Sequence, residues 1–185
     1  MDDFSSGKKS ETTCAQFEHE TEACKFFDEV IGGSGLFTIH HEVKGMIEYR
    51  RPWKNDGDVR IDRILSPAKG LWAKGWDMGF VGVEIKRSGK KIGPPLAQAM
   101  DYLDSVWFIT PAKLAIHISH AFLFPCGELY NTAGSFCAQH HLGQVDLTRY
   151  KIHFRSGQHT LFYYNITTGE VTCNGNRNGK KVGSR

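Results

Sequence analysis

Three charged side chains, Asp62, Glu84 and Lys86, stand inside apolar segments of this sequence. Asp62 interrupts the apolar run 61–65, while Glu84 and Lys86 are two positions apart in the run 81–86. Side chains two positions apart in a strand lie on the same face. If the two runs are adjacent strands, the three side chains meet at one point. Paired carboxylates bind hard divalent cations such as Mg²⁺ or Mn²⁺, and an ammonium beside them stabilises developing negative charge.

Such a group is suited to the hydrolysis of a phosphodiester. A bound cation activates a water molecule and neutralises charge on the scissile phosphate, and Lys86 orients that water or stabilises the charge that develops. The backbone carbonyl of Ile85, between the two charged residues, is placed to be a further ligand. The first helix is expected to complete the metal shell through Glu20, on its apolar face, or through the neighbouring His19.

The order of these residues resembles the signature of the PD-(D/E)XK nuclease superfamily, an Asp followed by (D/E)-x-K on consecutive strands. The segment Ile61-Asp62-Arg63-Ile64 is similar to the IDRI strand of the RecB-like members, and Gln98 and Tyr102 match their Q-x-x-x-Y motif. The resemblance covers about residues 13–123. It implies that Asp62 and Glu84 bind the metal, and that Lys86 acts on the attacking water. It also implies that Gln98 orients the site or contacts the phosphate backbone, with Tyr102 supporting it.

The sequence departs from the family at some positions. Ile61 stands where the superfamily name has a proline. Some members hold an iron–sulfur cluster through one upstream and three closely spaced downstream cysteines, but Cys126, Cys137 and Cys173 are too dispersed for this. We therefore expect no iron–sulfur cluster. Cys126, Cys137, His140 and His141 do not follow a recognised zinc spacing either, so zinc is not expected.

The hydrophobic periodicity predicts the elements that would position these residues. It favours a helix over 13–31 that ends at a glycine cluster, and a second helix over 94–108 that opens at a Pro pair. The segment 66–79 is expected to be a loop. The expected strands are 36–51 (one or two strands), 59–65, 80–86 and 115–124, followed by a short helix within 128–141 and an antiparallel meander of 145–154, 160–166 and 170–173.

The predicted fold is therefore of the mixed α/β (α+β) class, with a central mixed β-sheet flanked by helices. A restriction-endonuclease-like core over 13–124 follows from the resemblance. A C-terminal extension of the sheet is expected over 125–173 and a basic, flexible tail over 174–185. The chain of 185 residues is expected to form one nuclease domain.

The composition limits the kinds of partner that the chain is expected to bind. The net charge of +3 means that any phosphate-binding surface must come from local clustering. Three tryptophans lie near basic residues on predicted loops: Trp53, Trp72 and Trp76. Each of them either stacks on unpaired bases or fills the core. The basic residues expected to form a DNA groove flank the candidate site: Arg50, Arg51, Lys54, Arg63, Arg87, Lys90 and Lys91.

These patterns together predict a Mg²⁺- or Mn²⁺-dependent deoxyribonuclease, exo- or endonucleolytic, in the processing or degradation of phage or mobile-element DNA. One alternative is a dimeric, structure-specific endonuclease of the junction-resolvase type, which requires a homo-oligomer. Another is a catalytically silent nucleic-acid-binding module. No secretory signal or bilayer-spanning apolar run is visible, so we expect a cytoplasmic protein of a bacterium or a phage-infected host, with no membrane partner and with free thiols.

Overall fold

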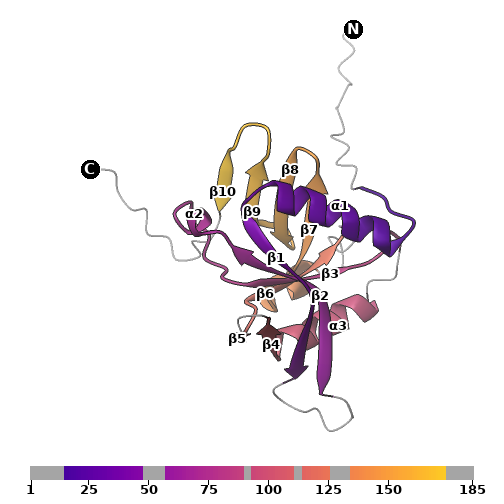
Figure 1. Cartoon of the computed structure of the whole chain (residues 1–185). Helices are drawn as coiled ribbons and strands as arrows, with labels where there is room; N and C mark the ends of the chain where they lie inside the picture. Colours follow the sequence, from indigo (N-terminus) through magenta and orange to yellow (C-terminus); the bar gives the residue numbers. More distant parts are fainter. Residues whose placement is uncertain (1–14, 48–56, 90–92, 111–113, 126–133, 174–185) are drawn as a thin grey trace.

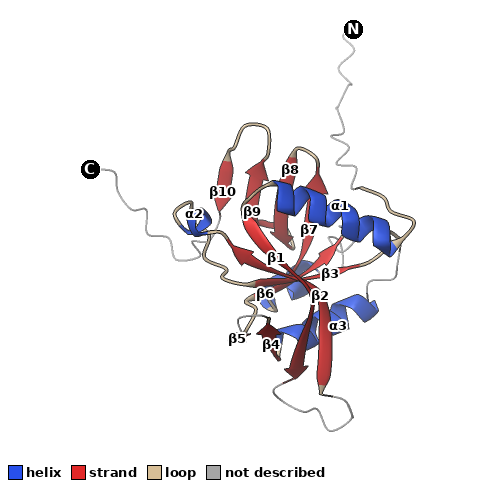
Figure 2. Ribbon diagram, in the orientation of Figure 1, coloured by secondary structure: helices blue, strands red, loops and turns tan. Residues whose placement is uncertain are grey.

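A large mixed β-sheet organises the chain, with helices on both of its faces (Figures 1 and 2). The structure is a computed structural model, and it describes residues 15–47, 57–89, 93–110, 114–125 and 134–173. In chain order its elements are α1 (Glu20–Gly33), β1 (Phe37–Ile47), β2 (Asp58–Pro67), α2 (Lys69–Trp72), β3 (Val81–Ile85), α3 (Gly93–Leu103), β4 (Ser105–Ile109), β5 (Leu114–Ile116), β6 (His120–Phe124), α4 (Gly134–Gln139), β7 (Leu142–Thr148), β8 (Lys151–Ser156), β9 (His159–Asn165) and β10 (Val171–Cys173).

The ten strands follow the order β10-β9-β8-β7-β6-β3-β2-β1-β4-β5. β1, β2 and β3 form an antiparallel meander, and the chain then returns through α3, β4 and β5 to place β6 parallel to β3. β7 joins β6 in parallel, and the strands from β7 to β10 pair antiparallel. The expected mixed α/β class with C-terminal antiparallel strands is confirmed.

The helix α1 lies across one face of the sheet (Figure 1). Ala23, Phe27 and Ile31 are buried at the spacing of one helical face. The helix begins at Glu20, later than the expected Thr13. Its N-cap residue, His19, has an extended backbone with φ −119° and ψ 143°. Within the described ranges, no helix combines the length and the apolar character that crossing a bilayer requires.

Two apolar clusters pack on the two faces of the sheet. The first gathers α1 with side chains such as Leu65 and Val83, and the second gathers α3 with side chains such as Ile61 and Ile64. Trp76 is 3% exposed in the first cluster, where its indole packs edge-on against neighbouring phenylalanine rings. The alternative that Trp76 stacks on bases is therefore wrong. Trp72 is exposed, and Trp53 lies outside the described residues.

Three predicted elements differ from the structure. The helix expected over 94–108 ends at Leu103, because β-branched and aromatic side chains make 105–109 the strand β4. The strand expected over 115–124 is divided into β5 and β6. The expected loop 66–79 contains the short helix α2. The helix predicted within 128–141 corresponds to α4. Residues 126–133 lie outside the described part.

A largely buried histidine on β8 gives a pH-dependent stability. Burial, and then the charge of Arg155, lower the pKa of His153 from its ordinary 6.5 to about 4. As the pH falls through about 6.5, an unfolded chain protonates this ring, whereas the folded chain does so only near pH 4. We expect the free energy of unfolding to fall by about 2 kcal/mol over this window because of His153. Urea unfolding should show this loss in the parent and in the exposed-site control His159→Gln, but not in His153→Gln.

Candidate active site

The structure brings Asp62, Glu84 and Lys86 together where β2 and β3 separate. The last paired residues of the two strands are Arg63 and Val83, so Asp62 and Glu84 face each other immediately beyond them. The Nζ of Lys86 lies 2.5 Å from Glu84 Oε1. A pocket of about 490 Å³ opens over this group, and its described lining residues are Glu20, Asp58, Val59, Arg60, Asp62, Glu84, Lys86, Gln98, Asp101 and Tyr102.

The backbone of Ile85 is part of the same group. Its N–H donates a hydrogen bond of 2.7 Å to Asp62 Oδ2. In an extended strand the N–H and C=O of one residue point to the same side, so the Ile85 carbonyl also faces the β2 side. Because Ile85 lies beyond the last rung of the β2–β3 ladder, β2 does not take up this carbonyl in regular pairing.

Of the two helix residues expected near the site, Glu20 is the one that faces it. Glu20 lines the pocket, and its Oε1 lies 3.9 Å from Lys86 Nζ. His19 is the N-cap residue of α1, is exposed and is not among the described lining residues. The structure therefore places a third carboxylate, and not an imidazole, beside Lys86.

The residues Gln98 and Tyr102 are joined to Glu84 by hydrogen bonds. They lie one turn apart on α3, and the Gln98 side-chain amide donates to the Tyr102 hydroxyl. The hydroxyl lies 2.6 Å from Glu84 Oε2 and 2.9 Å from the Arg60 carbonyl, and its single proton serves one of them at a time. Packing alone was expected of Tyr102, but the structure connects it directly to the buried carboxylate.

Burial and mutual charge make this group attract positive charge. Burial, and then the charge of Asp62, raise the pKa of Glu84, although Lys86 and Tyr102 act in the opposite direction. Burial acts to lower the pKa of Lys86, but its bond to Glu84 and the charges of Glu84, Asp62 and Glu20 outweigh burial and raise it. Both directions mean that the site retains protons, so it favours cations.

The donor set fits a hard divalent cation. Mg²⁺ usually binds through one or two carboxylates and keeps several waters, and Asp62, Glu84 and the Ile85 carbonyl supply oxygen donors of this kind. Among the described residues, no three His, Cys, Asp or Glu side chains are grouped closely enough to form a metal site by themselves. Glu20 contacts the group through Lys86, at 3.9 Å, and a cation would compete with Lys86 for Glu84.

Arg63 does not belong to a DNA-binding surface, contrary to the sequence-based expectation. Its side chain is 7% exposed, and its Nε and Nη2 donate to the two oxygens of the Asp28 carboxylate of α1, each at 2.8 Å. A third bond runs from Nη1 to the backbone carbonyl of Asp62 at 2.7 Å. Burial acts to lower the pKa of Arg63, but the bond to Asp28 raises it. Arg63 thus fixes α1 to β2 directly beside the candidate site.

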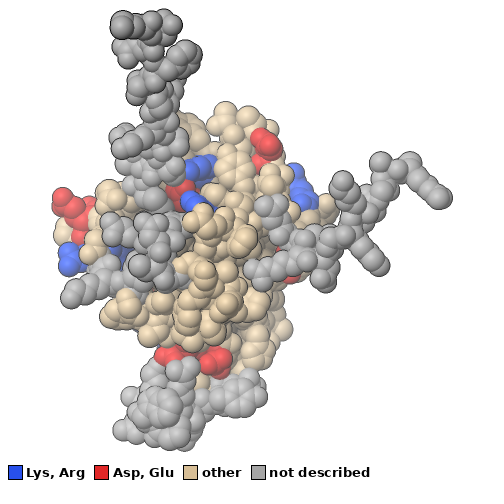
Figure 3. Space-filling view, turned by 180° about the vertical axis from the view of Figure 1, so that it is seen from behind, with Lys and Arg blue, Asp and Glu red and all other residues tan. Residues whose placement is uncertain are grey.

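The other residues expected in the DNA groove are only partly placed by the structure. Arg87 is exposed, immediately after Lys86. Seen from behind, the described surface carries small, separate groups of basic and acidic side chains (Figure 3). The residues that lie outside the described part are Arg50, Arg51, Lys54, Lys90 and Lys91.

No cysteine or histidine is among the described residues that line this pocket. Cys137 is buried as a free thiol in α4, and the His141 ring packs edge-on against His120. Cys24 and Cys173 are free as well. Cys14 and Cys126 lie outside the described residues.

Sequence reasoning missed two residues next to the site, Arg60 and Glu42. Arg60 lines the pocket, and its Nε lies 3.1 Å from Glu42 Oε2. Glu42 has a φ of 49°, a left-handed conformation that is uncommon for a residue other than glycine. It lies in β1 between His41 and Val43, which pair with Arg63 and Ile61, so it stands next to Asp62. The position of Arg60, two residues before Asp62 in a predicted strand, could have indicated it. No sequence pattern indicates Glu42.

The hydrogen bond between Tyr102 and Glu84 gives a prediction. Tyr102→Phe removes the hydroxyl, so Glu84 and the Arg60 carbonyl lose a donor. Partners that orient a metal ligand usually contribute about 10–100-fold in metal affinity or activity. We expect Mn²⁺ affinity, measured by calorimetry, to fall by about tenfold, while Tyr150→Phe, at an exposed position, leaves it unchanged. Equal Mn²⁺ affinity in Tyr102→Phe and the parent would show that the hydroxyl does not orient Glu84.

Comparison of the chain with protein-family models, with curated proteins and with solved structures found no match.

Proposed function

We propose that this chain is a divalent-cation-dependent deoxyribonuclease of the PD-(D/E)XK type. The observation that carries the proposal is the convergence of Asp62, Glu84 and Lys86 in one pocket, from two adjacent strands. The order of helix, central mixed sheet and packed helix, seen in α1, the β1–β3 meander and α3, supports the restriction-endonuclease-like core that the resemblance implies. Processing or degradation of phage or mobile-element DNA is the role we propose for it.

The charge of the pocket supports a cation in the reaction. Its described lining carries five carboxylate residues and two cationic ones, a net formal charge of −3. A phosphodiester brought into this pocket would meet repulsion from all sides, except beside Arg60 and Lys86. A bound Mg²⁺ or Mn²⁺ would reduce that repulsion, and it would supply an activated water and charge neutralisation at the phosphate. We therefore expect DNA to bind productively only after the cation.

Each residue of the chain then has a defined part. Asp62, Glu84 and the Ile85 carbonyl would hold the cation, and Glu20 would reach it from the helix side. Lys86 would be released from Glu84 by the cation, would keep its proton, and would place a positive charge beside the attacking water and the developing negative charge on the phosphate. Tyr102, held by Gln98, keeps the second oxygen of Glu84 in place.

Two other functions use the same site differently. A dimeric, structure-specific endonuclease would require an interface between two copies of this chain. A silent nucleic-acid-binding module would bind DNA without cleaving it, and it has no use for opposed carboxylates that repel each other when no cation is bound. The close approach of Asp62 and Glu84 therefore favours the catalytic function over the silent one.

The proposal is tested by Mn²⁺ calorimetry on the parent, Asp62→Asn and Glu84→Gln, with DNA cleavage measured on the same samples. We expect Mn²⁺ binding and cleavage in the parent, and loss of both in the two variants. Asp77→Asn, at an exposed position outside the described pocket lining, should behave as the parent. DNA binding by the parent without Mn²⁺ binding or cleavage would favour the silent module, and a dimer in sedimentation that cuts branched DNA alone would favour the resolvase type.

A further inference from the structure

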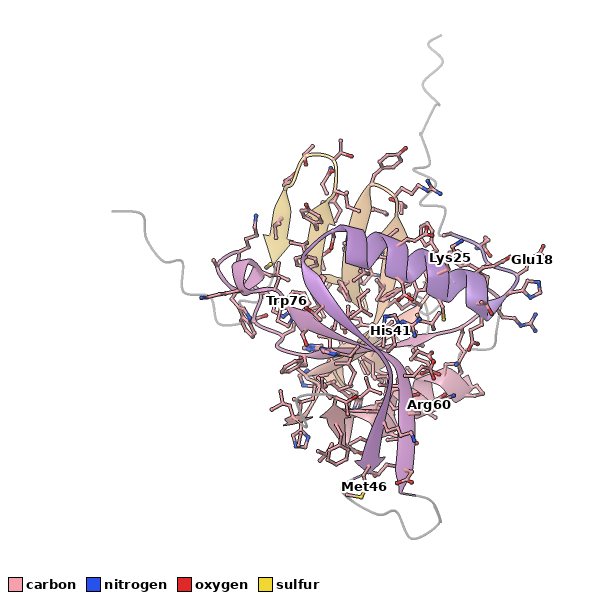
Figure 4. All side chains as sticks on the ribbon, in the orientation of Figure 1. Glu18, Lys25, His41, Met46, Arg60 and Trp76 are labelled. Carbon is pink, nitrogen blue, oxygen red and sulfur yellow. The ribbon has the colours of Figure 1, made fainter. Side chains whose placement is uncertain are left out.

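Arg60 combines the features of a substrate-binding residue. It is the one arginine among the described residues that line the pocket, and its side chain is 67% exposed. Arg60 lies on the stretch of β2 that passes α3 (Figure 4), where its backbone carbonyl is within 2.9 Å of the Tyr102 hydroxyl. Since the same hydroxyl lies 2.6 Å from Glu84 Oε2, the backbone of Arg60 lies close to the candidate catalytic group.

The second cation of the described lining, Lys86, is already engaged. Its Nζ lies between the carboxylates of Glu84 and Glu20, and it is mostly buried. Arg60 is paired too, with Glu42, but it is 67% exposed and lines the pocket, so it lies at the rim, where a phosphate outside the reacting position would be. A guanidinium presents a planar fork of donors that matches two oxygens of one phosphate. This geometry suits contact with the backbone of a nucleic acid, which carries no sequence information.

Glu42 holds this guanidinium through a weak pair. The Arg60 Nε–Glu42 Oε2 distance is 3.1 Å, but the Glu42 side chain is 50% exposed, so the pair contributes little to stability. The left-handed backbone of Glu42 lies in the middle of β1 and beside Asp62. Backbone strain of this kind occurs at functional sites more than elsewhere. Because the Arg60–Glu42 pair contributes little to stability, a phosphate can replace Glu42 as the partner of Arg60 at a small cost in free energy.

We propose that Arg60 binds the phosphate next to the scissile one in the DNA backbone, and that Glu42 holds Arg60 at the pocket rim until DNA arrives. This inference rests on the proposed nuclease function and assigns a subsite to it. The ligand is the phosphodiester backbone itself, with no preference for a base. Binding exchanges one partner of the guanidinium for another, so the charge of Glu42 opposes DNA binding.

The test measures DNA binding in a chain that does not cleave. Fluorescence anisotropy of a labelled duplex, and of its single strand, is recorded with Mg²⁺ at several salt concentrations in the Lys86→Ala background. Arg60→Ala, Arg60→Lys and Glu42→Gln are compared with Lys25→Ala. Lys25 is a matched control because it is an exposed cation paired with an exposed carboxylate, Glu29 at 4.0 Å, on α1. Mn²⁺ calorimetry on each variant reports the metal site separately.

We expect Arg60→Ala to weaken DNA binding by about tenfold at low salt and to reduce the slope of log affinity against log salt by about one. Arg60→Lys should keep the slope and lose part of the affinity, and Glu42→Gln should bind DNA more tightly. Lys25→Ala should lie within twofold of the background, and Mn²⁺ affinity should be unchanged in all of them.

Three results would overturn the proposal, and they are distinguishable. If the background protein binds DNA with Mg²⁺ but Arg60→Ala binds it equally well with the same salt slope, the subsite is wrong and the nuclease proposal stands. If the background protein binds no DNA with or without Mg²⁺, and the parent cleaves none, both proposals are wrong. A loss of Mn²⁺ affinity in Arg60→Ala equal to its loss of DNA affinity would also overturn the subsite, because Arg60 would then act through the metal site.

Discussion

Lys86→Ala is expected to lower the rate of DNA cleavage by about a thousandfold while Mn²⁺ binding persists. The alanine leaves no positive charge beside the attacking water, and groups that stabilise developing charge contribute about 10²–10³-fold each. Lys86 Nζ also competes with a cation for Glu84, at 2.5 Å from its Oε1. Mn²⁺ should therefore bind at least as tightly in Lys86→Ala as in the parent. Single-turnover cleavage and Mn²⁺ calorimetry measure the two effects.

The chain offers a matched control for this substitution. Lys151 Nζ lies 2.6 Å from the buried Asp146 carboxylate, and its side chain is 24% exposed, against 22% for Lys86. Lys151→Ala thus removes an ammonium from a similar environment outside the described pocket lining. Both variants should lose similar stability, but cleavage should fall in Lys86→Ala alone. Equal rate losses in both variants would mean that Lys86 has a structural role only.

Arg63→Met is expected to lower the free energy of unfolding by about 3 kcal/mol. The substitution leaves the partly buried Asp28 carboxylate without the guanidinium that bonds both its oxygens, and breaking a buried ion pair from one side typically costs about 3–5 kcal/mol. Asp28 keeps some contact with water, which favours the lower end of this range. Urea unfolding of Arg63→Met measures the loss.

The double variant Arg63→Met with Asp28→Asn controls for the pair. It should lose less stability than the sum of the two single variants, because the second substitution removes a partner that the first has already stranded. Additive losses would show that the two residues act independently. A normal unfolding free energy in Arg63→Met combined with weaker DNA binding would instead make Arg63 a surface contact, as the sequence pattern had indicated.

The candidate site could be predicted from the sequence because its chemistry is local. Asp62, Glu84 and Lys86 are charged residues inside apolar strands, and a two-residue period places Glu84 and Lys86 on one face without knowledge of the fold. The same two-residue period explains why the strands that contain these residues could be predicted. Gln98 and Tyr102 were identified through the Q-x-x-x-Y motif of the resembled family, and their spacing predicted only that they lie one helical turn apart. The meeting of Asp62 with Glu84 depended in addition on the two predicted strands being adjacent.

What could not be predicted depends on contacts between distant segments. The partner that buries Arg63 is Asp28, on a different element, and no local pattern distinguishes a paired guanidinium from an exposed one. The left-handed backbone of Glu42 stands beside Asp62 only because β1 pairs with β2. Similarly, the helix predicted over 94–108 included most of β4, because strand and helix patterns overlap in short apolar runs.

The central claim is that the pocket holding Asp62, Glu84 and Lys86 hydrolyses DNA with a divalent cation. Its most direct test is incubation of the protein with linear and closed-circular DNA in Mg²⁺, Mn²⁺ or EDTA, beside Asp62→Asn. We predict cleavage that requires the cation and disappears in Asp62→Asn. Cutting of both forms would identify an endonuclease, and loss of the linear form alone an exonuclease. No cleavage of either form with any cation, or equal cleavage by Asp62→Asn, would contradict the claim.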